Sequence, residues 1–375
     1  MLPQRLSISL YPVRSDALFA KPNNRLTPFP YSALGNNRFP HGILAGVNGY
    51  ARQPTVIAVL GPTASGKSVL GIELALRLNG EIINCDSVQV YQGINVATAK
   101  VPPAERRGVP HHLIDFVPPE VNFSAGEWAR EAANKIREIH MRGRLPIIVG
   151  GTGFYFRALR QPFFPSPQTD LNIRHRLNQI RQLRGPEHLH RILTRLDAVS
   201  AQQLFPRDWP RVQRAIEVSM QTGKPISAQK HLGLVASSIG QIRVIALNPP
   251  RSALYHRINA RTQEHFSAGL VEEVRQLLAL GVAPDSNALG AHGYRRVVEY
   301  LQSKRDLAAA IEQTKLDVRH YAKRQLTWLR READVEWYAG FGDDANIQRR
   351  VFKALNTEVS QKQHKLSSPS PRISG

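Results

Sequence analysis

Between residues 53 and 165 the apolar positions switch repeatedly between two patterns. Short apolar runs, typical of strands, alternate with stretches in which apolar residues recur at the spacing of a helix. The runs that predict strands lie at 55–60, 81–84, 112–117 and 145–149. Strands that alternate with helices predict a parallel sheet with right-handed crossovers.

The helix expected before the last of these strands has signals at both ends. Ser124 and Glu127 have the spacing of a capping box, in which each side chain binds a backbone N–H of the other residue. An apolar series at helical spacing follows, at Trp128, Ala132, Ile136 and Ile139. Gly143 ends the series. Another helix is predicted over 69–78, directly after the first strand.

The pattern changes after the strand at 145–149. A Pro-rich segment at 161–167 is followed by residues 171–230, which are helical in pattern and carry eleven Lys and Arg against four Asp and Glu. An apolar run typical of a strand returns at 242–247. We therefore expect an α/β fold: a P-loop parallel sheet core flanked by helices, with an inserted all-helical domain and C-terminal helices.

The remaining segments complete the expected domain organisation. Helices are predicted over 252–280, ended by Gly281, and from Asp306 to Arg331. We expect a disordered extension at 1–52, an α/β core formed by 53–165 and 238–340, a helical insertion at 166–237 and a mobile tail at 341–375. The extension is rich in Arg and Ser and poor in acids, which suits either an organelle transit peptide or a misassigned start site.

Charge and composition narrow the class of partner. The chain has 375 residues, a formal net charge of +21 and a pI near 10.6, which favour a polyanionic partner. Cys85 is the only cysteine, which excludes an internal disulfide and a cysteine-based zinc site. No apolar run approaches the roughly 18 residues that span a bilayer. We expect no membrane association and a cytoplasmic location.

The first candidate for chemistry is a phosphate-binding loop that follows the strand at 55–60. It reads Gly61, Pro62, Thr63, Ala64, Ser65, Gly66, Lys67 and Ser68. Strand, Gly-rich turn and helix N-terminus together favour an oligophosphate, because loop N–H groups and the positive helix end face the anion. Lys67 adds a positive charge, and the Ser68 hydroxyl suits Mg²⁺.

Two further strand ends should meet this loop. In open parallel sheets, ligands bind beyond the carboxyl ends of the strands. Asp86 follows the strand at 81–84, and Gly150 to Gly153 follow the strand at 145–149. Asp86 could therefore hold a metal through water or accept a proton, although an Asx-turn or helix cap is the structural alternative. The strand before Gly150 lacks the terminal Asp that often holds Mg²⁺ in ATP-hydrolysing P-loop enzymes, which argues against an ATPase.

Several motifs together resemble the tRNA dimethylallyltransferases, the isopentenyltransferases that modify adenosine 37 beside the anticodon. They run in the order of that family over about residues 55–340, at 61–68, 86–91, 97–100, 109–115, 149–153, 211–218 and 321–328. With one cysteine, the eukaryotic type of zinc finger is impossible, so the bacterial form is the better match. His292 stands where this family usually has an apolar residue, and Val318 where it usually has Thr.

The resemblance implies an activity and a site. A dimethylallyl group would pass from dimethylallyl diphosphate to N6 of adenosine 37, with the diphosphate in the loop at 61–68 and Mg²⁺ as the neutralising cation. Asp86 would be the base, and Thr152 would lie at the reaction site. The implied tRNA contacts are Asp86, Ser87, Val88, Gln89, Thr152, Arg174, Gln213, Arg214, Ala215, Ile216 and Glu217. The resemblance implies that 53–165 and 238–340 form the catalytic core and that the insertion at 166–237 binds tRNA. The implied partners are the tRNA anticodon stem-loop and dimethylallyl diphosphate, and we expect a monomer.

Three alternatives remain at this point. An isopentenyltransferase for free AMP, ADP or ATP would share the loop and the acid, but it would not require the basic helical insertion. A small-molecule kinase would bind ATP in the loop, and the missing acid after Val149 argues against it. A nonenzymatic RNA-binding protein would not need Lys67, Ser68 and Asp86 intact.

Overall fold

In a computed structural model of the chain, residues 56–161, 167–229 and 239–366 are described, the last ten of them as backbone only. The predicted extension at 1–52 lies outside these ranges, as do 162–166, 230–238 and the chain end from 367. Six parallel strands form one sheet in the order β3-β2-β4-β1-β5-β6. Their bounds are β1 Val56–Leu60, β2 Gly80–Cys85, β3 His111–His112, β4 Leu145–Gly150, β5 Ile242–Leu247 and β6 Val335–Tyr338.

The α/β fold expected from the sequence is confirmed, with two differences in the strands. The run at 112–117 yields only the two-residue β3 and an isolated bridge from Val117 to Tyr91. Leu113 and Asp115 have φ values of 58° and 54°, and this left-handed backbone cannot continue a strand. The short edge strand β6 was not predicted, because its four residues give too little alternation to recognise.

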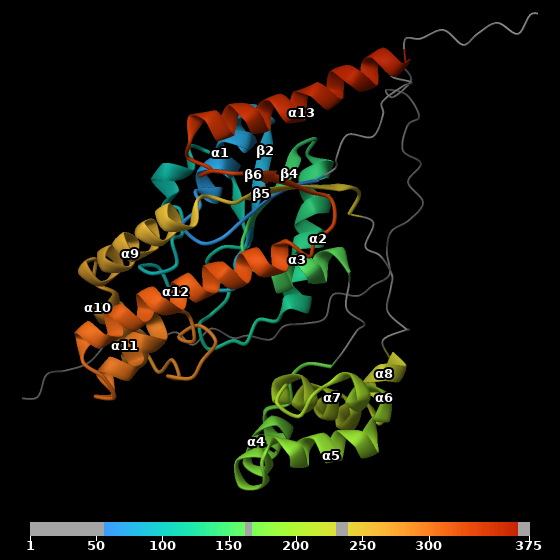
Figure 1. Ribbon diagram of the computed structural model, residues 1–375, viewed down its shortest axis with the longest axis vertical. Helices are drawn as coiled ribbons and strands as arrows, with labels where there is room; N and C mark the ends of the chain where they lie inside the picture. Colours follow the sequence, from blue (N-terminus) through green and yellow to red (C-terminus); the bar gives the residue numbers. More distant parts are fainter. Residues whose placement is uncertain (1–55, 162–166, 230–238, 367–375) are drawn as a thin grey trace, which may run out of the picture. The chain divides into compact units, whose positions relative to one another are not determined.

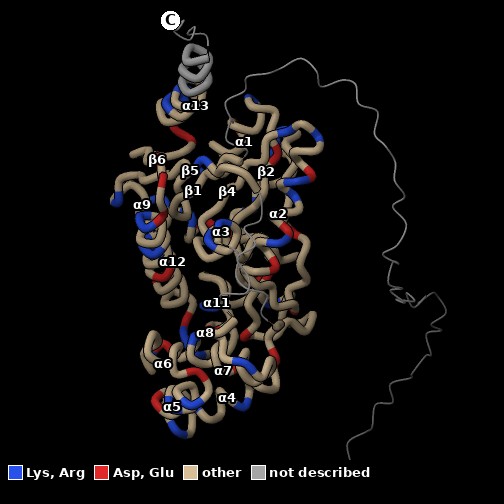
Figure 2. The backbone as a smooth tube through the Cα atoms, turned by 90° about the vertical axis from the view of Figure 1, so that its right-hand side faces the viewer, with Lys and Arg blue, Asp and Glu red and all other residues tan. Residues whose placement is uncertain are grey.

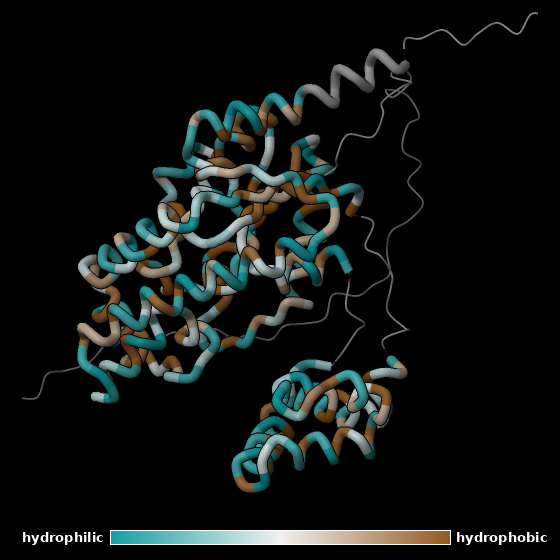
Figure 3. The backbone as a smooth tube through the Cα atoms, viewed as in Figure 1, coloured by the Kyte–Doolittle hydropathy of each residue, from teal (hydrophilic) through white to brown (hydrophobic). Residues whose placement is uncertain are grey.

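Helices cover both faces of the sheet (Figure 1). Alternate residues of β1 point to opposite faces, so Ala58 and Val59 belong to different hydrophobic cores. One core contains residues of α2 (Ala125–Met141) and α3 (Gly153–Arg160), and the other contains residues of α1 (Lys67–Arg77) and α13 (Ala345–Leu366). The most apolar segments accordingly lie inside the α/β core (Figure 3).

The end of the chain differs from the mobile tail expected from residue 341. Residues 345–366 form α13, and its apolar side chains repeat at helical spacing. Ile347, Val351 and Phe352 are buried in the same core as α1, and the Arg77 guanidinium lies 4.0 Å from the centre of the Phe352 ring. The helix is ordered by this packing, which charge and composition alone did not reveal.

The capping box of α2 forms as predicted. Glu127 N donates to Ser124 Oγ at 3.2 Å, and Ser124 N donates to Glu127 Oε2 at 2.8 Å. Trp128, in the first turn, is fully buried and its Nε1 donates to the carbonyl of Asn84 at 2.9 Å. The helix is thereby attached to the end of β2, immediately before Asp86.

The C-terminal part of the core supplies the helices beneath the sheet edge. They are α9 (Arg251–Ser267), α10 (Leu270–Ala279), α11 (Tyr294–Leu301) and α12 (Leu307–Leu329). The single helix predicted over 252–280 is divided at Gly269, whose φ of 96° ends α9 and begins α10. The helix predicted from Asp306 to Arg331 is α12, and Asp306 is its N-cap, with Oδ1 accepting from Ala309 N at 2.7 Å.

Residues 167–229 form a helical module with its own hydrophobic core. Its helices are α4 (Leu171–Arg184), α5 (Pro186–Leu196), α6 (Ala198–Gln203), α7 (Trp209–Thr222) and α8 (Ile226–Gln229). Among the described residues, one further helix occurs: η1, a short 3₁₀ helix at Pro103–Arg106. In the parts of the chain that are described, no helix combines the length and the apolar character that crossing a membrane requires.

Candidate active site

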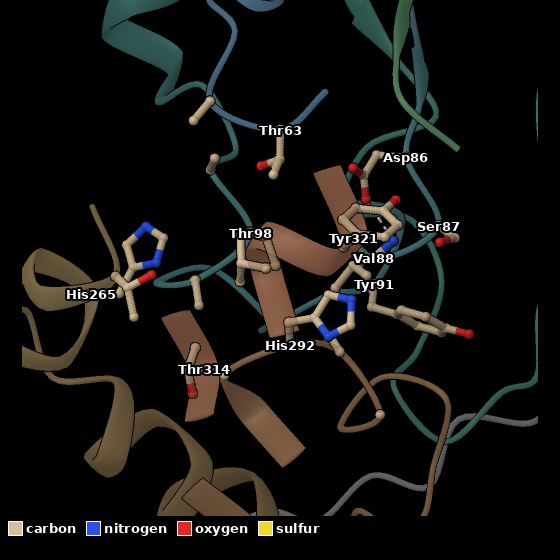
Figure 4. Close-up of a pocket in the computed structure, with 18 of the residues that line it drawn as sticks. Thr63, Asp86, Ser87, Val88, Tyr91, Thr98, His265, His292, Thr314 and Tyr321 are labelled. Atoms are coloured by element: carbon tan, nitrogen blue, oxygen red, sulfur yellow. Dashed lines mark hydrogen bonds between the residues drawn. The ribbon is translucent and has the colours of Figure 1, made fainter. Parts of the chain in front are cut away.

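A cavity of about 440 Å³ opens at the carboxyl ends of the strands (Figure 4). Thr63 and Ala64 of the phosphate-binding loop and Asp86 after β2 line the same space. Helices α9 and α12 close the other side with residues such as Arg261 and Tyr321. The loop and the acid that the sequence placed at one sheet edge therefore lie in one cavity.

The phosphate-binding loop has the backbone of an anion site. Ala64 and Gly66 adopt left-handed φ values of 62° and 79°, which turn successive N–H groups inward. Gly66 is the N-cap of α1, so the amides of Lys67 and Ser68 belong to the unpaired first turn of that helix. An oxyanion placed there would meet these N–H groups and the positive end of α1.

The loop is held from two sides by distant segments. Gln325, buried on α12, accepts from Thr63 N at 2.7 Å and donates from Nε2 to the carbonyl of Gly151 at 2.9 Å. Gly342 N, just after β6, donates to the carbonyl of Ser65 at 2.8 Å. A phosphate would therefore bind a loop whose shape is already set by α12 and the end of the sheet.

The ammonium group of Lys67 is buried, which disfavours its charged form. Its Nζ donates to the carbonyl of Pro62 at 2.6 Å. Burial lowers the pKa of Lys67 to about 8; the charge of Asp86 opposes this shift and that of Arg261 adds to it. A bound diphosphate would relieve the cost by supplying negative charge beside the ammonium.

Asp86 forms the Asx-turn considered for it and also lies at the cavity. Its Oδ1 accepts from Val88 N at 2.9 Å and from Gln89 N at 3.3 Å, which is an Asx-turn. The same carboxyl lines the cavity. No residue in the described ranges is hydrogen-bonded to Oδ2, so this oxygen can receive a proton from a ligand.

Thr152 does not line the cavity but contacts two residues that do, Ser87 and Tyr321. Its Oγ1 accepts from Ser87 N at 3.0 Å, and its backbone N donates to the carbonyl of Cys85 at 3.1 Å. Tyr321 also hydrogen-bonds the Thr152 side chain, and burial raises the pKa of Tyr321 above its ordinary range. Thr152 therefore positions Ser87 and Tyr321, which face the cavity, rather than facing it itself.

The other residues implied at the β2 end divide into two groups. Ser87 and Val88 line the cavity. Gln89 does not: its Nε2 donates to the carbonyls of Thr98 and Ala99 at 2.9 and 3.3 Å. It thus holds the loop that forms another wall, since Thr98 and Ala99 both line the cavity.

The segment from Gln213 to Glu217, expected to contact tRNA, is mostly internal to the helical module. Ala215 and Ile216 lie in the module's hydrophobic core, and Gln213 donates to the carbonyl of Arg174 at 3.0 Å. The carboxylate of Glu217 is fully buried and pairs with Arg174 and Arg214, each at 3.2 Å. The side chains of Ala215 and Ile216 pack inside the module, so they are not accessible to RNA.

Three of the ionisable residues that line the cavity were not proposed as site residues from the sequence. Arg261 lines the cavity from α9, and burial lowers its pKa from the usual value. His265, one turn later, is neutral because burial and the charge of Arg261 lower its pKa to about 4. The ring centre of His292 lies 5.0 Å from that of Tyr321 (Figure 4). For His292 the sequence contained one signal, a histidine where the family usually has an apolar residue. For Arg261 and His265 it contained none, because polar residues are common on the exposed face of a helix.

Comparisons with known proteins agree with this geometry. The family model described as IPP transferase matches residues 89–332. A tRNA dimethylallyltransferase of Solibacter usitatus is 45% identical over 304 residues, covering 80% of this chain and 99% of the relative. One of Koribacter versatilis is 44% identical, covering 81% and 99%.

Solved structures give the same answer. The full-length tRNA isopentenylpyrophosphate transferase of Bacillus halodurans is 36% identical with a TM-score of 0.59, covering 83% of this chain and 97% of that one. A eukaryotic dimethylallyltransferase acting on tRNA is 28% identical with a TM-score of 0.67, covering 82% and 79%. The family model spans most of the chain, and the two tRNA dimethylallyltransferase relatives are 45% and 44% identical over about four fifths of it. The chain therefore belongs to the IPP transferase family.

Proposed function

We propose that this protein transfers a dimethylallyl group from dimethylallyl diphosphate to N6 of adenosine 37 in tRNA. The observation that carries the proposal is a single cavity that joins a phosphate-binding loop to a carboxylate on the neighbouring strand end. The names of the relatives, tRNA dimethylallyltransferases, support the same reaction.

The donor would bind at the loop. Its diphosphate would bind the amides at the start of α1 and the charged groups of Lys67 and Arg261, which are close enough for Arg261 to lower the pKa of Lys67. The bond between C1 of the allyl group and the diphosphate oxygen breaks, and its electron pair leaves with the diphosphate. Preorganised N–H groups and cations lower the barrier because they stabilise that developing charge.

The acceptor would enter beside Asp86. N6 of adenine forms the new bond to C1 and loses one proton, which Asp86 Oδ2 accepts, so charge and atoms balance. N6 of a stacked adenine is inaccessible, and the base must first be extruded into the cavity. Tyr321 and Val88 would border the base, since both line the cavity at the Asp86 end (Figure 4).

The helical module at 167–229 would grip the tRNA backbone. Basic residues occur along α4 and α5 (Figure 2), and those exposed on the module are Arg176, Arg184, Arg191, Arg195, Arg207, Arg211 and Lys224. Contacts of this kind give affinity for phosphates without reading sequence. We propose these exposed residues, acting in a monomeric enzyme, in place of the buried Ala215 and Ile216.

Mg²⁺ fits the loop as a metal shared with the substrate. The Ser68 hydroxyl lies at the start of α1 and is partly exposed. No cluster of three or more His, Cys, Asp or Glu that could hold a metal occurs among the residues described. Ser68 would therefore hold Mg²⁺ together with diphosphate oxygens and water, an arrangement common for this ion, and the metal would neutralise phosphate charge when bound.

A direct assay tests the proposed reaction. The protein is incubated with dimethylallyl diphosphate, Mg²⁺ and either an unmodified tRNA or AMP, and the nucleosides are analysed by mass spectrometry. We expect prenylated adenosine from tRNA alone. Product from AMP and none from tRNA would overturn the assignment in favour of a free-nucleotide enzyme.

The donor should bind progressively less well above about pH 8. The pKa of Lys67 in the free protein is about 8, so its ammonium is present below that pH and is lost above it. We expect kcat/KM for dimethylallyl diphosphate to be flat from about pH 6.5 to 7.5 and then to fall toward tenfold per pH unit. Steady-state kinetics with tRNA saturating measure this, and Lys67→Arg, which stays charged, should remove the fall.

A further inference from the structure

The cavity has a polar region that the transfer of a dimethylallyl group does not use. This region is lined by one histidine and three threonines: His265, Thr98, Thr262 and Thr314. The three of them that are labelled in Figure 4 lie apart from Asp86, where the adenine would enter. A dimethylallyl group has no polar atom, so it would leave these side chains without a hydrogen-bond partner.

His265 has an unused capacity for hydrogen bonds. Burial and the charge of Arg261 lower the pKa of His265 to about 4, so the ring is neutral and offers one donor and one acceptor. Within the described parts of the chain, no residue forms a hydrogen bond with either ring nitrogen. A partly buried imidazole without a partner costs free energy, which a polar atom of a ligand would recover.

The threonines of the polar region supply hydrogen-bond acceptors. All three are buried, and each hydroxyl donates to a carbonyl of its own segment: Thr98 to Asn95 at 2.9 Å, Thr262 to Ile258 at 2.8 Å and Thr314 to Ala310 at 2.7 Å. A hydroxyl oxygen that has donated its hydrogen can still accept one. Thr262 and His265 are three residues apart, hence on one side of α9. Together they can bind a ligand hydroxyl as acceptor and as donor.

The contacts around Gly293 bring two of these threonines together. A Cβ at Gly293 would lie 3.6 Å from Thr314 Cγ2 and 3.7 Å from Ala97 Cβ, and Thr98 is the next residue after Ala97. The same Cβ would lie 3.4 Å from Leu270 Cδ2. The polar region is therefore bounded by α12, by the loop at 97–99 and by the start of α10.

Helix α9 connects the polar region to the place where the diphosphate would bind. Arg261 is close enough to Lys67 to lower the pKa of that lysine. His265 follows Arg261 by four residues, a rise of about 6 Å along the helix, which is comparable to the length of a five-carbon chain. Ile258 and Leu270 are buried and give the cavity apolar walls. A donor with its diphosphate at Arg261 can thus place its carbons on these walls and its far end near His265.

We propose that the cavity also takes a hydroxylated donor, the analogue of dimethylallyl diphosphate in which one methyl group is a hydroxymethyl group, and that His265 binds its hydroxyl. This inference rests on the proposed function, because it concerns the donor of the same reaction. The bond from C1 to the diphosphate oxygen breaks, and its electron pair leaves with the diphosphate. N6 of adenine bonds to C1 and loses one proton to Asp86. The hydroxyl is carried unchanged into the product, so no oxidant is required.

A comparison of the two donors tests the proposal. The wild-type protein is incubated with unmodified tRNA and either donor, and the modified nucleosides, which differ by one oxygen atom, are measured by mass spectrometry. The quantity compared is the ratio of kcat/KM for the hydroxylated donor to kcat/KM for dimethylallyl diphosphate. We expect a wild-type ratio above about one fifth, because a hydroxyl buried without a partner would lower the ratio by about fivefold or more.

Substitutions of His265 test whether this residue binds the hydroxyl. His265→Leu should lower the ratio by about fivefold to about 150-fold, because the hydroxyl loses its partner. His265→Gln keeps a donor and an acceptor, so its ratio should stay within about threefold of wild type. The ratio is insensitive to changes in diphosphate binding or in the folded fraction, since both donors share these.

Two further variants complete the test. Thr262→Val keeps the shape of the side chain and removes its oxygen, so it should also lower the ratio, and it gives a result even where His265→Leu fails to fold. His256→Leu makes the same change at an exposed residue of α9 outside the cavity wall, and both kcat/KM values should stay within about twofold of wild type.

The outcomes separate this proposal from the function on which it rests. Wild-type protein that prenylates tRNA with neither donor contradicts the proposed function. Wild-type protein that uses dimethylallyl diphosphate but gives a ratio below about one fifth contradicts only the use of a hydroxylated donor. A wild-type ratio above that value which neither His265→Leu nor Thr262→Val lowers contradicts the role of the polar region.

Discussion

Asp86→Asn is expected to lower kcat by about 10²–10⁴, the range measured for loss of a general base. The amide oxygen of Asn can still accept from Val88 N and Gln89 N, so the Asx-turn that Asp86 forms should survive. What is lost is the negative charge and the proton acceptor at Oδ2. Single-turnover prenylation of tRNA measures the rate, and filter binding should show tRNA affinity within about threefold of wild type.

The pH of the assay matters for this variant, because the charge of Asp86 influences the pKa of Lys67. The charge of Asp86 opposes the lowering of the Lys67 pKa, so removing it should bring that pKa below 8. Comparison at about pH 6.5 keeps Lys67 protonated in both proteins. Asp285→Asn, at an exposed carboxylate outside the cavity wall, is the matched control. A kcat within threefold of wild type would remove Asp86 from the proton transfer.

Lys67→Met should lower kcat/KM for dimethylallyl diphosphate by about 10²–10³, because it removes a preorganised charge from the departing diphosphate. The methionine side chain is similar in length and apolar, so the site keeps its volume. The fall of kcat/KM above about pH 8 should also disappear, since the titrating group is absent. Steady-state kinetics across pH measure both effects.

The same variant separates function from stability. Burial lowers the pKa of Lys67, which means that the folded state carries the cost of a partly desolvated ammonium below about pH 8; deprotonation relieves this cost as the pH rises. Removing the charge should therefore leave the melting temperature unchanged or raise it, while activity falls. Lys304→Met, at an exposed lysine after α11, is the control. A large drop in melting temperature would assign Lys67 to structure.

Local sequence patterns were sufficient for much of the core. The strands at 55–60, 81–84, 145–149 and 242–247 were predicted to within one residue at each end. The capping box of α2 was predicted from two residues. These features depend on neighbouring residues and on the spacing of apolar residues, both of which can be read from the sequence.

The pairing of Asp86 with the phosphate-binding loop was also predictable, for a topological reason. Consecutive strands of a parallel sheet end at the same edge, so Thr63 and Asp86 had to lie on one side of it. The structure adds that Asp86 Oδ1 accepts the hydrogen bonds of the turn while the same residue lines the cavity, a combination that sequence spacing cannot show.

Other residues acquired their roles only through long-range contacts. Gln325 connects Thr63 and Gly151 across more than 170 positions of sequence, and α13 packs on α1 from the opposite end of the chain. The burial of Ile216 reverses an expectation drawn from a motif, because a motif does not say which helix face turns inward. The chain alone determined the elements, their order and the edge at which the chemistry lies. Which side chains face the cavity, which are consumed in packing, and which brace the loop were decided by tertiary contacts, since these depend on distances between segments that no local pattern encodes.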